Sequence, residues 1–312
     1  MNNGPITNQH VGTTSDTALE NGVDMPIVLD EAPEQKRNLG FTLIELSIVL
    51  VIIGLIVGGI LVGQDLIAAA RIRATVGQIE KYNSAVNTFQ TKFNGIPGDL
   101  LSTTASGFGL STLAGTTGRG DGNGLIDGII AGASSQAAWT QEGGALWVHL
   151  SQANLVDGTF SESLDGTSPI AVPAASVSMT WPLAKIGRGN YINAGSASGI
   201  NYWVVTGITA GLTTGGLNAY GALTPIEAYN MDIKLDDGNP LTGVVQTHGT
   251  SANGASTGSL TLFTDAPSAA SASTTGDCLA GDTAGTATTD TYNRSITAGG
   301  TTPTCILRFR FN

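Results

Sequence analysis

The sequence has few charged side chains and few of the residues that usually carry catalysis. Lys and Arg total 13, His totals 3, and charged residues make up 12% of the 312 residues. The formal net charge of −11 argues against a general phosphate-binding surface, so no nucleic-acid partner is predicted. There are only two cysteines, and no CxxC or Cys/His spacing indicates a zinc or redox centre.

The sequence contains a single long apolar run. Residues 41–63 form a run of 23 residues with a single charge, Glu45. A helix of this length spans roughly 34 Å, which is enough to cross a bilayer core of about 30 Å. Lys36 and Arg37 lie just before the run, so the positive-inside rule predicts a cytoplasmic N-terminus and export of the rest of the chain.

The arrangement differs from that of an ordinary secretory signal, which is cleaved after its apolar stretch and rarely contains a carboxylate. An unpaired carboxylate in hydrocarbon costs a few kcal/mol on insertion scales, so Glu45 is expected to have a partner. In a bundle of such helices, that partner would be the α-amino group of a neighbouring subunit. Cleavage between Gly40 and Phe41 would create this group at the right end of the helix.

The stretch KRNLG followed by FTLIELSIVLVIIGLI resembles the processing site of type IV prepilins and type II secretion pseudopilins. The resemblance implies cleavage between Gly40 and Phe41 by prepilin peptidase, N-methylation of Phe41, and a subunit-docking role for Glu45. It also implies other pilins and an inner-membrane assembly platform as partners. The precursor would lie in the inner membrane, and the filament in the periplasm or on the cell surface.

Two features depart from the family pattern. The leader of 40 residues is long, and Met25 is an alternative start to Met1 that would leave a leader of 16. Val62 stands where the family often has proline. Four glycines lie in the same region: Gly54, Gly58, Gly59 and Gly63. They would allow either local melting of the helix or close packing of helices, and the sequence does not separate the two.

Beyond the apolar run, apolar residues recur every three or four positions up to Phe93, which predicts a helix from about Thr42 to Asn94. Gly95 and Pro97 are suitable stop signals. We therefore divide the chain into four parts. They are a leader that is removed (1–40), a transmembrane and filament-core helix (41–63), an amphipathic continuation (64–94) and a globular head (95–312).

The head is expected to be an antiparallel sheet packed against the long helix, which makes the fold α+β. Residues 139–157 predict a short helix, and residues 201–206 and 306–311 predict strands. Residues 228–245 predict strand, turn and strand, because DDGNP supplies turn chemistry. Residues 246–304 are rich in Gly, Ser, Thr and Ala and predict an exposed loop region.

The two cysteines lie near the C-terminus. In an oxidising compartment Cys278 and Cys305 would pair and close a loop with 26 residues inside. By the loop-entropy model this crosslink contributes on the order of 3 to 4 kcal/mol. The alternative is two unrelated buried thiols. The family often displays a disulfide-bounded loop near its C-terminus, and the resemblance implies the same here.

One loop has the beginning of a calcium-binding pattern. Asp121, Asn123 and Asp127 place oxygen atoms at positions 1, 3 and 7. Position 5 is Leu125 and position 12 is Gly132 rather than glutamate, so an Asx/Gly-rich turn is favoured over a calcium site. Calcium is the only cofactor that the sequence suggests.

Neither catalysis nor a single type of filament follows from the sequence. Residues 254–258 match GxSxG but lie in low-complexity sequence without a following helix, so no enzyme is predicted.

The leading hypothesis is a structural subunit of a type IV pilus or pseudopilus. The alternative is a membrane-anchored surface module, or minor pilin, whose head binds a ligand. Residues 41–312 are 272 in number, which is large for the family and favours a minor or specialised subunit.

Overall fold

The computed structural model describes residues 40–112, 120–126, 142–161, 177–208, 219–249, 278–280, 291–295 and 303–311. The chain divides into two compact units, residues 1–56 and residues 57–312. Helices and antiparallel strands occur together in the second unit, so the predicted α+β class is confirmed.

The longest element is the helix α1, Leu43–Phe93. Nine of its residues are buried, all in its second half: Ile72, Thr75, Val76, Ile79, Tyr82, Ala85, Val86, Phe89 and Phe93. They recur every three or four positions, as one face of a helix requires. The helix ends before Asn94, which adopts a φ of 54°, because a left-handed residue stops the helical hydrogen-bond ladder. The predicted helix is confirmed to within one residue at each end.

The head contains an antiparallel sheet of five strands: β1 Asn190–Ala197, β2 Ile200–Ile208, β3 Ala219–Tyr220, β4 Val245–Gly249 and β7 Cys305–Phe311. Their order is β1-β2-β7-β4, and β3 pairs with the end of β2. Ser198 and Gly199 join β1 to β2 with φ values of 50° and 73°. Two consecutive positive values are those of a type I′ turn, which suits a tight hairpin. The two strands predicted over 201–206 and 306–311 are confirmed.

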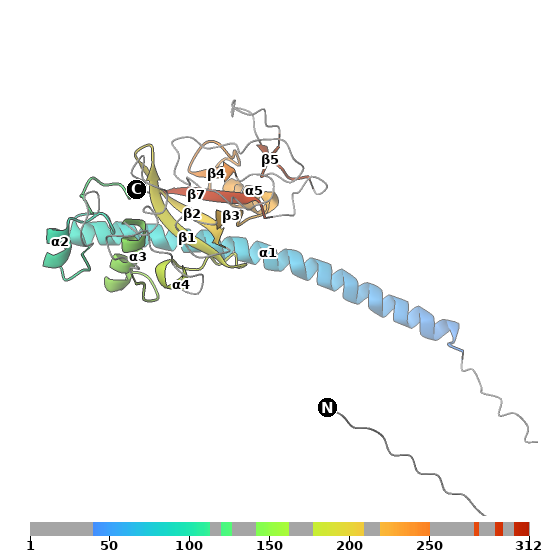
Figure 1. Ribbon diagram of the computed structural model, residues 1–312. Helices are drawn as coiled ribbons and strands as arrows, with labels where there is room; N and C mark the ends of the chain where they lie inside the picture. Colours follow the sequence, from blue (N-terminus) through green and yellow to red (C-terminus); the bar gives the residue numbers. More distant parts are fainter. Residues whose placement is uncertain are drawn as a thin grey trace, which may run out of the picture. The chain divides into compact units, whose positions relative to one another are not determined.

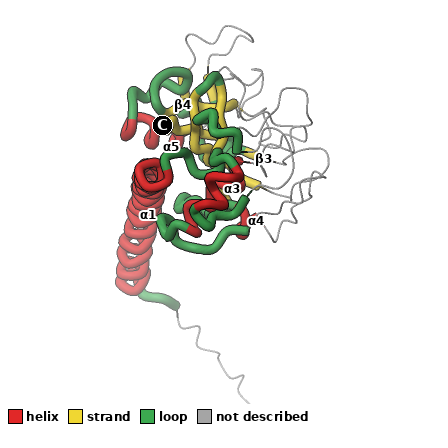
Figure 2. The backbone as a smooth tube through the Cα atoms, turned by 90° about the vertical axis from the view of Figure 1, so that its left-hand side faces the viewer, coloured by secondary structure: helices red, strands yellow, loops and turns green. Residues whose placement is uncertain are grey.

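The core forms where the second half of α1, the sheet and α3 (Glu142–Gln152) meet. Tyr82 of α1 packs on Trp147 of α3 with ring centroids 4.8 Å apart, and Trp147 packs on Trp203 of β2 at 5.3 Å. Trp203 Nε1 also donates a hydrogen bond to Asn83 Oδ1 at 2.7 Å. Figure 1 shows α3 and the sheet beside this part of α1, and Figure 2 shows the same elements turned by 90°. The short helix predicted within 139–157 is α3.

The prediction of strand, turn and strand over 228–245 is wrong at its start. The helix α5 spans Pro225–Leu235, and only β4 follows as a strand. Glu227 N–H donates to Thr224 Oγ1 at 3.2 Å, while Thr224 N–H donates to Glu227 Oε2 at 2.9 Å. This reciprocal capping box, with Pro225 at the first helical position, specifies a helix start. The T-P-x-E signal was present in the sequence and outweighs the local strand propensity.

The prediction of an exposed loop over 246–304 is wrong for most of its described residues, although Arg294 and Ser295 are exposed and lie outside any helix or strand. Within it, β5 (Leu279–Ala280) pairs with β6 (Thr291–Tyr292), and the Cys278, Leu279 and Tyr292 side chains are buried. The first residues of the range belong to β4, and residues 250–277, 281–290 and 296–302 lie outside the described residues. Two short helices, α2 (Ser102–Gly107) and α4 (Val177–Thr180), complete the described elements.

Candidate functional site

The start of α1 carries the residues that the sequence assigns to processing and docking. Thr42 directly precedes the helix, and Glu45 is its third residue. Glu45 Oε2 accepts hydrogen bonds from the Thr42 backbone N–H at 2.8 Å and from the Thr42 hydroxyl at 2.9 Å. Glu45 N–H in turn donates to Thr42 Oγ1 at 3.3 Å. The two residues therefore form a capping box that satisfies the helix start.

The capping box is a second role for Glu45 that the sequence analysis missed, although T-x-x-E before an apolar run is its signature. Both bonds from Thr42 end on the same oxygen, Oε2. Within the described residues, Oε1 accepts no hydrogen bond. The carboxylate can therefore cap its own helix and still accept a hydrogen bond from another molecule.

The apolar side chains around Glu45 are exposed on every side of the helix. Leu43 is 89% exposed and Leu55 is 76% exposed, and the residues between them are exposed as well. Among the described residues, α1 is the one helix that is long and apolar enough to cross a membrane. A continuous apolar surface of this kind is unfavourable in water, so this segment requires lipid or other helices around it.

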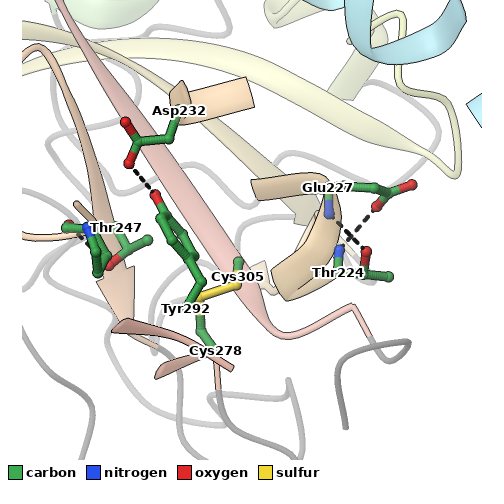
Figure 3. Close-up of a disulfide and its surroundings, with 8 residues drawn as sticks. Thr224, Glu227, Asp232, Thr247, Cys278, Tyr292 and Cys305 are labelled. Atoms are coloured by element: carbon green, nitrogen blue, oxygen red, sulfur yellow. Dashed lines mark hydrogen bonds between the residues drawn. A yellow bond between two sulfur atoms is a disulfide. The ribbon is translucent and has the colours of Figure 1, made fainter. Parts of the chain in front are cut away.

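The two cysteines form a disulfide, as predicted, with their Cα atoms 4.9 Å apart. Figure 3 shows the bond next to Tyr292, whose hydroxyl donates to Asp232 Oδ2 at 2.6 Å. Cys305 begins β7, the strand between β2 and β4, and Cys278 directly precedes β5. The crosslink therefore ties the small β5–β6 sheet to the main sheet of the head.

Comparison with protein-family models matches residues 35–61 to the prokaryotic N-terminal methylation motif. The match covers the basic pair, the Gly40–Phe41 junction, Glu45 and most of the apolar run. The chain therefore carries a prepilin signal of the type IV pilin and pseudopilin type. No curated protein and no solved structure matches the chain significantly. Its long N-terminal helix, antiparallel sheet and C-terminal disulfide fit an α+β pilin fold.

In the head, buried carboxylates hold the loop of residues 120–126. Asp99 accepts the N–H of Gly122 on Oδ1 at 2.8 Å and the N–H of Gly124 on Oδ2 at 2.7 Å. Glu142, at the start of α3, accepts the N–H of Gly120 on Oε1 at 2.6 Å. Both carboxylates are buried. They therefore replace water as acceptors for the loop backbone.

These carboxylates also approach the predicted metal site. Oxygen atoms of Asp99, Asp121 and Glu142 lie within 4.8 Å of one another. The pKa of Asp99 is raised to about 6, mainly by burial; the nearby charge of Asp121 contributes to this rise, and the bonded N–H groups of Gly124 and Gly122 oppose it. Asp99 and Glu142 lie about 20 residues from Asp121 in sequence, so no local spacing could have indicated their approach.

The three predicted metal ligands have different outcomes. Asp121 lies in this group, Asn123 Oδ1 accepts the N–H of Leu125 at 2.7 Å, and Asp127 lies outside the described residues. Asp121 Oδ1 accepts the N–H of Asn123 at 3.0 Å, so the loop contains the Asx turns that the sequence favoured. Calcium binding stays a prediction.

The remaining candidates for catalysis have structural roles or lie outside the described residues. His149 is buried; its Nδ1 accepts the N–H of Gly98 at 2.9 Å and its Nε2 donates to Ser111 O at 2.8 Å. It therefore joins α3 to two loops as a neutral imidazole, and burial lowers its pKa. The GxSxG match at 254–258 lies outside the described residues. The methylation motif indicates a structural rather than an enzymatic protein.

Proposed function

We propose that the chain is a structural subunit of a type IV pilus or pseudopilus. Prepilin peptidase cleaves it between Gly40 and Phe41, Phe41 is N-methylated, and the helices of residues 41–63 pack together in a helical filament. The observation that supports this most is the apolar start of α1, which is exposed on every side and carries the methylation motif. Lateral packing of such helices would cover this surface once the subunit leaves the membrane.

Glu45 would direct the packing through its charge. Cleavage turns the Phe41 nitrogen into an ammonium group at the end of the chain. An apolar bundle makes isolated charges costly, so the Phe41 ammonium of one subunit and the Glu45 carboxylate of its neighbour would neutralise each other. Oε1 is available for this pair while Oε2 stays bonded to Thr42. Four residues separate the charges, so neighbouring helices would be offset by about 6 Å.

The proposal names partners and a location. The precursor lies in the inner membrane with its N-terminus in the cytoplasm, where prepilin peptidase and the assembly platform act on it. Other copies or homologous pilins then surround its helix in a filament in the periplasm or on the cell surface. The basic pair Lys36 and Arg37, just before the apolar run, supports this orientation.

The processing step is tested by the intact mass and N-terminal sequence of protein recovered from its native membrane or from shed filaments. We expect a chain that begins at Phe41 and is one methyl group heavier than unmodified residues 41–312. A chain that keeps its leader in cells with an active prepilin peptidase would overturn the proposal.

Assembly is tested by two matched variants that separate charge from capping. Glu45→Gln removes the charge but keeps a side chain that can complete the capping box, whereas Thr42→Val removes the capping hydroxyl and keeps the charge. We expect Glu45→Gln to abolish incorporation into filaments and Thr42→Val to reduce it only modestly. Equal losses in the two variants would show that Glu45 acts through the helix cap alone.

A further inference from the structure

A hollow of about 400 Å³ lies between α1 and α5, just beyond the apolar run in sequence. It is lined on α1 by residues from Asp65 to Arg73 and on α5 by residues from Ile226 to Lys234. Both walls belong to the same compact unit, residues 57–312, and α5 lies beside α1 in Figures 1 and 2. The hollow is therefore a feature of the head and the adjoining part of α1.

Three charged side chains of this hollow have no partner in the part of the chain that the structure describes. Asp65, Arg73 and Lys234 are exposed, and none of them takes part in an ion pair or a side-chain hydrogen bond there. Glu227, the fourth charged residue of the hollow, is already paired with Arg188 at 2.6 Å. The unpaired side chains carry two positive charges and one negative charge, although the whole chain has a net charge of −11. Such a hollow favours a ligand that also carries both signs.

The hollow lies where the exported surface of the membrane is predicted. Asp65 is two residues beyond Gly63, the last residue of the apolar run, and Arg73 is ten residues beyond it. These residues lie about 3 Å and about 15 Å past the run along the helix axis. The polar headgroup layer adds roughly 5 to 7 Å on each side of the bilayer core. Helical side chains lean toward the N-terminus, which here is the membrane side, so the long Arg73 side chain can reach this layer.

Exposed apolar side chains lie at the same level of α1. Leu66 and Ile67 follow Asp65 directly and are 67% and 55% exposed. Such side chains are favourable beside lipid acyl chains and unfavourable in water. A phospholipid combines the two parts that this region requires, because it has a charged headgroup for the hollow and acyl chains for these side chains.

We propose that the hollow between α1 and α5 binds the headgroup of a phospholipid that carries a primary amine. The headgroup phosphate accepts hydrogen bonds from the Arg73 guanidinium and the Lys234 ammonium, and the amine donates to the Asp65 carboxylate. An anionic headgroup without an amine leaves Asp65 unpaired beside a phosphate, and a choline headgroup has no N–H to donate. The charges of the hollow therefore select among the lipids of one leaflet.

This inference goes beyond the proposed function and rests on one part of it, the membrane orientation of residues 41–63. The bound lipid would hold the head against the exported surface of the membrane in the precursor. The contact with the bilayer would end when the subunit leaves the membrane for a filament.

Retention of lipid by the full-length chain tests the proposal. The chain is purified in a mild detergent and mixed with phosphatidylethanolamine, phosphatidylcholine or phosphatidylglycerol of the same acyl chains, and native mass spectrometry measures the complexes. We expect one phosphatidylethanolamine per chain, bound about tenfold more tightly than phosphatidylcholine, because only the first donates to Asp65. Equal retention of the three lipids would overturn the proposal.

Matched variants assign the binding to the hollow. Arg73→Gln combined with Lys234→Gln should reduce the retention of all three lipids about tenfold or more. Asp65→Asn should remove only the preference for phosphatidylethanolamine. Arg71→Gln and Glu80→Gln are the controls, since both residues are exposed on α1 and unpaired there but do not line the hollow. Losses as large in the controls as in the hollow variants would overturn the assignment.

Free phosphate is an alternative source of the same chemistry, and a competition experiment separates the two sources. Inorganic phosphate at millimolar concentration is added to the chain loaded with phosphatidylethanolamine. We expect the lipid to stay bound, because its acyl chains remain in contact with Leu66 and Ile67. Release of the lipid would overturn the lipid assignment and identify a phosphate site instead.

A cysteine in the hollow gives a second readout, in a bilayer rather than in detergent. Asn230 lines the hollow and is exposed. In nanodiscs, Asn230→Cys should react with a water-soluble maleimide several-fold more slowly in phosphatidylethanolamine than in phosphatidylcholine. Asn87→Cys, exposed on α1 outside the hollow, should react equally in both lipids. The native cysteines are paired with each other and buried, so they do not interfere. Equal rates for Asn230→Cys in the two lipids would contradict the proposal.

The outcomes separate this inference from the proposed function. An unchanged chain that is processed at Phe41 and forms filaments, but retains no phosphatidylethanolamine, would overturn the lipid site alone. A chain that retains the lipid but is never processed would overturn the filament proposal and leave the lipid site intact. Absence of the unchanged chain from the membrane fraction would overturn both.

Discussion

The two halves of α1 differ in the exposure of their apolar side chains. In the first half they cover every side of the helix and are exposed, whereas from Ile72 onward they occupy one face and are buried. No break separates the halves, since α1 is continuous over 51 residues and through five glycines. One continuous helix can therefore expose apolar side chains in one half and bury them in a protein core in the other, because the side chains and not the backbone differ between the halves.

The contrast extends to what each half needs from the rest of the chain. The second half is held by ring contacts and a hydrogen bond to β2 and α3. The first half has no such contacts and carries its own cap in Thr42 and Glu45. Substitutions in the two halves should therefore affect different measurements, and four predictions test this separation.

The largest expected effect on stability is in the core beneath the second half. Trp203→Ala removes a fully buried side chain that packs on Tyr82, Trp147 and Phe311. We expect it to lower the free energy of unfolding of the head by about 3 to 5 kcal/mol. The matched change Leu50→Ala, in the exposed half, should lower it by less than about 0.5 kcal/mol. Chemical denaturation of the detergent-solubilised chain measures both free energies of unfolding. Equal losses in the two variants would contradict the difference between the halves of α1.

Loss of the disulfide should have the next largest effect, confined to the head. Replacing both Cys278 and Cys305 by serine should cost about 3 to 4 kcal/mol of stability by the loop-entropy model. Membrane insertion of the precursor should be unchanged, because the crosslink lies far from the apolar run in sequence. Denaturation of the oxidised and serine forms measures the first effect, and membrane fractionation measures the second. A serine form as stable as the oxidised protein would contradict the prediction.

The pH dependence of head stability should follow its buried carboxyl groups. Burial raises the pKa of Asp99 and of Asp232 from 3.8 to about 6. Between about pH 4 and pH 6 the folded state therefore holds protons that the unfolded state has released. The free energy of unfolding should fall as pH rises through this window, by on the order of 2 to 3 kcal/mol for each group.

His149 opposes this trend, because its lowered pKa means that its stabilising contribution is lost as pH falls below 6.5. Denaturation from pH 4 to pH 8 measures the sum. The Asp99→Asn, Asp232→Asn variant should lose the decline between pH 4 and pH 6, and His149→Gln should make it steeper. An unchanged slope in the Asp99→Asn, Asp232→Asn variant would refute the assignment.

The smallest expected effect is that of calcium. If the group containing Asp121 binds calcium, an ion concentration ten times the dissociation constant should stabilise the head by about 1.4 kcal/mol. Thermal unfolding with calcium and with a chelator measures this effect. Asp121→Asn is the control that should remove it. Equal melting temperatures with calcium and with chelator would exclude a calcium site of useful affinity.

Local patterns in the sequence predicted a large part of this structure. The length of α1, its stop at Asn94, and the strands β2 and β7 followed from periodicity and from strong local signals. The helix α5 differs from the strand expected there because the capping box of Thr224 and Glu227 outweighs the strand propensity of the residues that follow. Cys278 and Tyr292 are buried although the surrounding sequence predicts an exposed loop, because a composition rich in small polar residues does not show which few positions become buried.

The sequence by itself determined the methylation motif with its predicted processing junction, the apolar run and the helix that continues from it. These features depend on neighbouring residues and on one repeating geometry. Only the tertiary structure decided that the last strand lies between β2 and β4, that Asp99 and Glu142 hold the loop around Asp121, and that Asp65, Arg73 and Glu80 have no partner in the described head. Such contacts join residues that are far apart in the chain. Their distances depend on how the core packs, so they cannot be predicted from spacing in the sequence.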